Sequence, residues 1–225
     1  MGKVKTTSLA NIAYEKIKSN IITNKLKPGE LLRSTQIAEE LNMSRTPIRE
    51  AISTLEKEGL VEIKNGVGVL VTEISESTLV ELFEIRSVLE LLALKMLMRK
   101  TFDQSIFLNL KKKWLDLKVR FDEGDMNIFD EINELDRRTH QEIRNHSGSV
   151  LLKTLIEDNI ELRMNRIQCL SVYALNDAEN TIQQHVDLLR LILENDYLKA
   201  SSVLEKHISD AIHYILDAQR KISVT

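Results

Sequence analysis

Proline and glycine are unevenly distributed along the chain, and this limits the folds that its two parts can adopt. Both prolines, Pro28 and Pro47, and five of the seven glycines lie within the first 70 residues. Beyond residue 77 only Gly124 and Gly148 interrupt a sequence whose apolar residues recur with helical spacing almost to the end. We therefore expect a mixed domain over residues 1–75 and an all-helical domain over residues 76–225.

Charge divides the chain at nearly the same place. Residues 1–72 carry 11 Lys and Arg against 8 Asp and Glu, a net charge of +3, and the rest carry 20 against 26, a net charge of −6. This asymmetry is typical of a mildly basic module attached to an acidic one. The single Cys169 excludes an internal disulfide framework. The sequence begins without an apolar signal segment and has no run of about 18 apolar residues, so we expect a cytoplasmic protein that does not bind membranes.

Residues 44–51 have the features of a helix start with exposed basic groups. Ser44 suits the N-cap position, because its hydroxyl can accept a hydrogen bond from an unpaired amide of a helix that begins at Arg45. Pro47 falls in the first turn, where a missing N–H costs little. Arg45 and Arg49 project from one side of this helix, and its buried face carries Ile48, Ala51, Ile52 and Leu55.

The flanking segments predict a winged helix-turn-helix. A helix over residues 34–43 comes before the basic helix, and Asn42 tolerates the left-handed conformation that a tight turn needs. Residues 60–63 and 67–71 are expected to form two strands joined at Asn65-Gly66. A basic helix start is often only a solvated face, but this order of helix, turn and capped basic helix is typical of DNA binding. A further helix is expected over residues 9–24, with one face made of Ile12, Ala13, Ile17 and Ile21.

This first segment resembles the DNA-binding domain of the GntR family of bacterial transcription regulators. The resemblance depends on Tyr14, Ile17, residues 26–32, residues 44–52, Leu55, residues 58–61, Gly66 and Gly68. Many members have an arginine where this chain has Thr35, so a contact by that arginine is not carried over.

We expect Arg45 and Arg49 to reach base edges or adjacent phosphates in the major groove, and Ser44 and Thr46 to contact phosphate. Gly66 would allow close approach of the wing to the DNA backbone. One such helix reads only a few base pairs, so we expect a homodimer on a palindromic double-stranded operator.

The second part of the chain is expected to be an antiparallel bundle of about six helices. Their predicted ranges are 77–99, 104–122, 125–145, 149–170, 178–195 and 197–220.

Four polar residues fall on the apolar stripes of this bundle. Asp136 and His140 lie one turn apart in the third helix, His185 lies in the fifth and His207 in the sixth. Each alone could be a satisfied core residue, but a shared cation would satisfy all four. Nitrogen and carboxylate ligands suit a divalent transition metal such as zinc, nickel, manganese or iron. His146 and His213 fall off the stripes and are expected to be structural or exposed.

Residues 77–220 resemble the FCD ligand-binding domain of the FadR subfamily of GntR regulators, and the helix count is similar to that of its VanR-like branch. The motif residues are Arg86 with Glu90, Asp136 with His140, His185 and His207. The resemblance implies that Asp136, His140, His185 and His207 are metal ligands. This chain has Ser149 where members often have Asn, and Asn195 where they have Gly.

Arg86 and Arg163 also lie on apolar stripes, and a buried guanidinium needs an anion. One hypothesis is an internal ion pair such as Arg86 with Glu90. The other is that an arginine binds the carboxylate of a small organic-acid effector held at or near the metal. The sequence thus predicts a DNA-binding transcription regulator, expected to be a repressor, that responds to such an effector and is not an enzyme. The alternatives are a metal-dependent enzyme with an attached DNA-binding module, and a regulator whose metal is purely structural.

Overall fold

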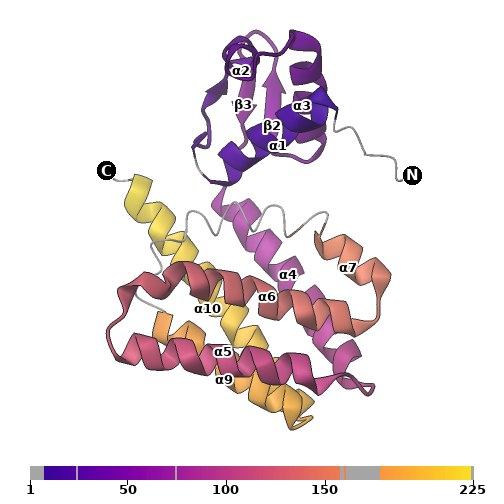
Figure 1. Ribbon diagram of the computed structural model, residues 1–225, viewed down its shortest axis with the longest axis vertical. Helices are drawn as coiled ribbons and strands as arrows, with labels where there is room; N and C mark the ends of the chain where they lie inside the picture. The colour runs from indigo at the N-terminus through magenta and orange to yellow at the C-terminus, as the bar shows by residue number, and fades with distance from the viewer. Residues whose placement is uncertain (1–7, 24, 74, 158–159, 161–177, 224–225) are drawn as a thin grey trace, which may run out of the picture. The chain divides into compact units, whose positions relative to one another are not determined.

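The computed structural model describes residues 8–23, 25–73, 75–157, 160 and 178–223, as Figure 1 shows. The chain divides into two compact units, Met1–Ser75 and Glu76–Thr225. Each unit has its own hydrophobic core. None of the described helices is long and apolar enough to cross a lipid bilayer.

The first unit is a three-helix domain with a small antiparallel sheet. Its elements are α1 (Leu9–Ile22), β1 (Leu31–Leu32), α2 (Ser34–Glu40), α3 (Arg45–Lys57), β2 (Val61–Lys64) and β3 (Gly68–Val71). The strand order is β1-β3-β2, and the hairpin register pairs Val61 with Val71 and Lys64 with Gly68. The winged helix-turn-helix expected from the sequence is therefore confirmed.

Three details of this unit differ from the expectations. Strand β1 was not predicted, because two residues are too short to show an alternating pattern. The helix predicted to reach residue 43 ends at Glu40, and Asn42 adopts the expected left-handed conformation with φ of 50°. Ile12 is 42% exposed, since it lies at the edge of the stripe whose other members, Ala13, Ile17 and Ile21, are buried.

Ser44 occupies the N-cap of α3 with an extended backbone, but its side chain makes no capping hydrogen bond. That part of the expectation was wrong, and Pro47 gives a reason. An N-cap hydroxyl accepts from the amide of the second or third helical residue, and the third residue of α3 is Pro47, which has no N–H. Helix α3 is held instead by its buried face, which consists of Pro47, Ile48, Ala51, Ile52 and Leu55.

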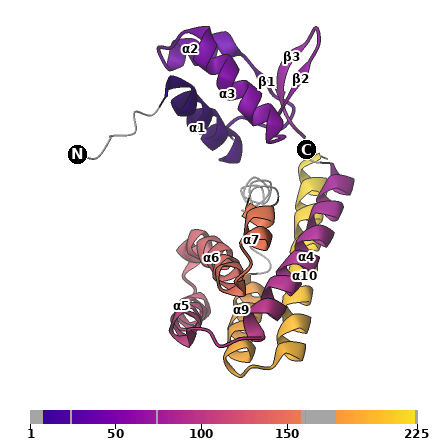
Figure 2. The same ribbon diagram turned by 90° about the vertical axis from the view of Figure 1, so that its right-hand side faces the viewer.

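The second unit is a bundle of long helices. Its described elements are α4 (Glu76–Met98), α5 (Gln104–Asp122), η1 (Met126–Ile128), α6 (Phe129–Ser147), α7 (Val150–Ile156), α9 (Ala178–Leu193) and α10 (Tyr197–Ser223). Helix α4 packs against α6 and α10, and α9 packs against α5 and α10 (Figure 2). The predicted mainly helical bundle is confirmed, although the third predicted helix begins with a short 3-10 turn. Most of residues 157–170, predicted to continue α7, lie outside the described residues.

Left-handed residues follow three described helices of this bundle, and the first is Gly124 after α5, with φ of 86°. Gly148 follows α6 with φ of 76°, and Asn195 follows α9 with φ of 57°. Asn is the residue besides glycine that best tolerates this conformation. The replacement of the family's usual glycine at position 195 therefore keeps the turn between α9 and α10.

Candidate metal centre and nucleic-acid interface

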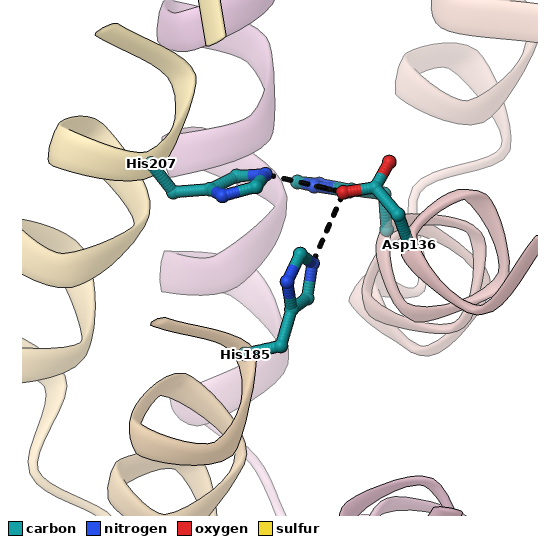
Figure 3. A group of neighbouring side chains, drawn as sticks. Asp136, His185 and His207 are labelled. Atoms are coloured by element: carbon teal, nitrogen blue, oxygen red, sulfur yellow. Dashed lines mark ion pairs between the residues drawn. The ribbon is translucent and has the colours of Figure 1, made fainter. Parts of the chain in front are cut away.

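Three helices bring the four predicted ligands together. Asp136 and His140 come from α6, His185 from α9 and His207 from α10, and Figure 3 shows His185 and His207 directed at the carboxylate. The Nε2 atoms of His185, His207 and His140 lie 3.2, 3.3 and 3.8 Å from Asp136 Oδ1. One potential ligand atom from each residue lies within 4.8 Å of all the others.

The other ring nitrogen of each histidine faces a hydrogen-bond acceptor. His185 Nδ1 lies 2.8 Å from the carbonyl oxygen of Thr181, and His207 Nδ1 lies 3.0 Å from Gln184 Oε1. His140 Nδ1 faces Glu90 Oε2 at 3.5 Å. Carbonyl oxygens only accept, so Nδ1 carries the proton in His185 and in His207, and the Nε2 of each presents its lone pair to the centre of the cluster. The carboxylate of Glu90 favours the same tautomer in His140, although the two side chains do not form a hydrogen bond.

The amide of Gln184 is itself oriented from outside the cluster. Its Nε2 donates to Asp210 Oδ2 at 2.7 Å, and Asp210 also accepts from Asn180 and Lys206. Because the amide nitrogen is engaged by Asp210, the amide oxygen faces His207. Such outer partners orient metal-binding histidines in known metal sites.

Three lone pairs and a carboxylate that converge in a buried space repel one another unless a positive charge lies between them. Protonation of His207 or His140 does not supply this charge, because burial and the neighbouring His185 lower the pKa of His207 to about 3, and burial lowers the pKa of His140. Among the described residues, both ring nitrogens of His140 and Nε2 of His185 have no hydrogen-bond partner. The donor set therefore fits a divalent cation.

The carboxylate of this cluster is ionised. Burial would raise the pKa of Asp136, but the facing imidazoles of His185, His207 and His140 outweigh burial and hold the pKa well below its usual value. Two ligands at 2.0–2.1 Å from a tetrahedral ion are roughly 3.3 Å apart, which is close to the Asp136 distances given above. Three imidazoles and one carboxylate suit zinc, nickel, manganese or iron.

A second charged group lies directly behind His140. Glu90 is completely buried, and its Oε1 accepts from Arg144 Nη1 at 2.7 Å while Arg86 Nε lies 3.9 Å away. Burial would raise the pKa of Glu90, but His140, Arg144 and Arg86 together lower it to about 2. The expected ion pair between Arg86 and Glu90 is therefore present but long, and Arg144 is the closer partner.

Sequence reasoning missed three residues that support the cluster, namely Arg144, Gln184 and Trp114. Arg144 follows Asp136 and His140 at the same four-residue spacing, so the pattern contained a signal for it. The ring of Trp114 stacks on His185 with centroids 4.2 Å apart, and its Nε1 donates to Thr139 Oγ1. Nothing in the sequence distinguishes Trp114 from an ordinary core residue.

The other two histidines of this unit do not belong to the cluster. His146 and His213 direct Nδ1 to backbone carbonyl oxygens of their own helices, at Glu142 and Ser209. Arg86 is buried, and its guanidinium lies 5.7 Å from the centre of the Phe83 ring. Arg163 lies outside the described residues.

The predicted DNA contacts gather at the exposed start of α3. Ser44, Arg45, Thr46 and Arg49 are all exposed, and neither arginine forms an ion pair or hydrogen bond with another described residue. Gly66 lies in the hairpin between β2 and β3 with φ of 78°, and no heavy atom of the described residues beyond its two chain neighbours lies within 4 Å of the position that a Cβ would occupy. The structure places Gly66 in the wing, as expected from the Asn-Gly pair.

Residues 9–71 match the family described as bacterial regulatory proteins of the gntR family, and residues 81–210 match the FCD domain. The chain therefore belongs to the GntR family and combines its helix-turn-helix domain with an FCD domain, which confirms the resemblance seen in the sequence. The VanR-like branch stays a prediction.

Similar proteins agree with this assignment. The chain is 27% identical over 195 residues to YdhC of Bacillus subtilis, an uncharacterized HTH-type transcriptional regulator, with 87% of this chain and 84% of YdhC covered. It is 27% identical over 211 residues to the HTH-type transcriptional repressor GlaR of Escherichia coli, with 91% and 94% covered. The solved structure of E. coli McbR/YncC superposes with a TM-score of 0.72 at 24% identity, over 93% of this chain and 98% of the other, and supports the fold. The chain is thus a transcription regulator and not an enzyme, as the sequence predicted.

Proposed function

We propose that this regulator is a homodimeric repressor whose affinity for a palindromic operator is controlled by a small carboxylate effector, bound at or near a divalent metal in the helical unit. The observation that carries the proposal is the convergence of three Nε2 lone pairs on Asp136 Oδ1. An effector can shift operator affinity only by its differential affinity for the two states of the protein.

The metal ligands in this proposal are Asp136, His140, His185 and His207. Four protein ligands leave positions open on an ion that accepts five or six, and an effector carboxylate is a suitable oxygen donor for them. The metal would supply a fixed positive charge in the bundle. The backbone carbonyl of Thr181 and the side chains of Gln184 and Glu90 would keep the imidazoles in the tautomer that can bind it.

Arg86 is proposed to contact the effector carboxylate. Its guanidinium is buried, and within the described part of the chain Glu90, at 3.9 Å, is its nearest carboxylate. Because Arg144 binds Glu90 more closely, Arg86 retains donors for a second anion. Arg163 remains in the proposal on the sequence pattern.

The DNA-binding half of the proposal is supported by the exposed arginines of α3. Arg45 and Arg49 would reach base edges or phosphates, Ser44 and Thr46 would contact phosphate, and Gly66 would admit the DNA backbone to the wing. The name of GlaR as a repressor supports the direction of control. Binding to chromosomal DNA in a bacterium requires a cytoplasmic location.

The test is to measure metal content and operator binding on the same protein. Elemental analysis should find about one divalent transition metal per chain. A panel of organic acids is then titrated against metal-loaded protein bound to operator DNA selected from random duplexes, and at least one acid should change the affinity.

The alternative of a purely structural metal predicts a different result. In that case metal is present and stoichiometric, but no acid of the panel shifts operator binding. Absence of metal from protein purified without chelators and reconstituted with zinc, nickel, manganese or iron would contradict both versions.

A further inference from the structure

The outward face of α4 is apolar, although this helix lies at the surface of its unit. Its inward face is buried against α6 and α10. The opposite face exposes Ile85, Val88 and Leu92, which are 47%, 67% and 43% accessible and recur at spacings of three and four. A helix that is apolar on both sides is normally covered on both sides.

The middle of this face also lacks charge. Between Ile85 and Leu94 the charged residues of α4 are Arg86 and Glu90, and both are buried on the inward side. Helix α10 differs, because its outward positions carry exposed charges such as Glu205 and Lys206. The outward face of α4 therefore has the composition of the centre of an interface and not of a solvated helix.

Charges lie at the two ends of the same face and have opposite signs. Glu81 and Glu84 are exposed before the apolar patch, and Lys95 and Arg99 are exposed after it. None of the four forms an ion pair with another described residue. Glu81 lies seven residues before Val88, and Lys95 lies seven residues after it.

The charges and apolar residues of this face are arranged symmetrically about Val88, so that two copies of the face are complementary to each other. If two copies of α4 pair antiparallel with a two-fold axis at Val88, Glu81 of each copy faces Lys95 of the other, and the apolar residues meet in the middle. A two-fold interface requires such self-complementarity, since the same patch serves both partners. Opposite charges across an interface also fix its register.

We infer that the outward face of α4, from Glu81 to Lys95, is the surface at which a second copy of this chain binds, with the two helices antiparallel about Val88. The inference rests on the homodimer of the proposed function and specifies its contact surface. The same helix carries Glu90 on its inward side, against His140 of the metal cluster. The helix that meets the partner is therefore also the helix that contacts the candidate metal site.

Helix α5 provides a matched control surface. It exposes Leu108, Leu115 and Val119, but exposed Lys112 and Asp116 interrupt the stripe. Val119 is 55% accessible, similar to Val88. A glutamate at either position is solvated in the monomer, so neither change should prevent folding.

The experiment is sedimentation of the full-length, metal-loaded protein over a range of concentrations, with circular dichroism to verify folding. Wild type should sediment at twice the chain mass of 25.9 kDa. Val88→Glu should raise the dimer dissociation constant roughly tenfold or more, because it places charge at the interface centre. Val119→Glu should have the same dimer dissociation constant as wild type.

The charge swap tests the antiparallel register. Glu81→Lys and Lys95→Glu should each weaken the dimer, and the double variant should restore it. A dimeric Val88→Glu variant with wild-type affinity, or a double variant no better than the single ones, would overturn this surface while the homodimer stands. A wild type that stays monomeric would overturn the homodimer of the proposed function as well.

Discussion

The two charged regions of this regulator differ in the exposure and pairing of their charged and polar side chains. At the start of α3, Arg45 and Arg49 are exposed and make no ion pair among the described residues, so a phosphate or base edge can bind them at little desolvation cost. In the bundle, His140, His185, His207 and Glu90 are buried, and each lies against an oriented partner. The comparison supports the proposals that the first region binds an external partner, the DNA, and that the second encloses a metal ion.

The largest effect is expected on metal content, when the buried cluster of Asp136 and three histidines loses a ligand. His185→Ala should reduce bound metal from about one ion per chain to none, because it removes a ligand that no neighbouring histidine can replace. Elemental analysis after gel filtration measures this. His213→Ala, which changes an exposed histidine of α10 outside the cluster, should keep the full metal content. Full metal content in His185→Ala would show that the cluster is not the metal site.

Removing the ion should destabilise the helical unit itself. At free metal about 1,000 times the dissociation constant, binding contributes about 4 kcal/mol of unfolding free energy. For a unit of this size that is a fall in Tm of roughly 8–16 °C when a chelator strips the metal. Differential scanning calorimetry measures it, and the Tm of His185→Ala should not respond to the chelator. An unchanged wild-type Tm would mean that the four side chains are satisfied without an ion.

A change to the exposed arginines of α3 should alter operator binding without altering the metal content of the helical unit. Arg49→Ala should weaken operator binding by about 1–3 kcal/mol if the guanidinium reads a base with two hydrogen bonds, and metal content should stay unchanged. Lys57→Ala, at the other end of α3, is the matched control and should bind as wild type. Fluorescence anisotropy with labelled operator measures the affinities. Equal binding by wild type and Arg49→Ala would remove Arg49 from the interface.

An effect of similar size is expected from the residue behind His140. Glu90→Gln keeps the shape but loses the charge that fixes the His140 tautomer, so metal affinity should fall roughly 10- to 100-fold. Competition with a chromophoric chelator measures this fall. Glu84→Gln, at an exposed position of the same helix, should have wild-type affinity. If Glu90→Gln and Glu84→Gln bind the metal with equal affinity, Glu90 does not orient His140 and serves only as the ion-pair partner of Arg144.

Much of the fold and part of the candidate site could be predicted from the sequence, because both depend on short-range periodicity. The spacing of Asp136 and His140 places them on one face of a helix whatever the rest of the fold does. Asn65-Gly66 similarly defines a hairpin by local conformation alone. These features do not depend on how distant segments pack.

The unpredicted features depend on contacts between distant segments. Gln184 faces His207 only because α9 packs against α10, and Arg144 reaches Glu90 only because α6 packs against α4. No periodicity within one helix contains this information. The missing N-cap bond at Ser44 has a local signal in the sequence, since Pro47 has no amide to donate and only the amide of Thr46 remains as a donor.

Trp114 is the only tryptophan of the chain, and its ring lies flat against a candidate metal ligand. Indole emission is sensitive to quenching by ions with unpaired d electrons, such as manganese or nickel, at such short range. The unlabelled protein therefore carries its own optical probe of the cluster. Ion entry, and any effector that alters the surroundings of His185, can be followed in real time from the intrinsic fluorescence of this one side chain.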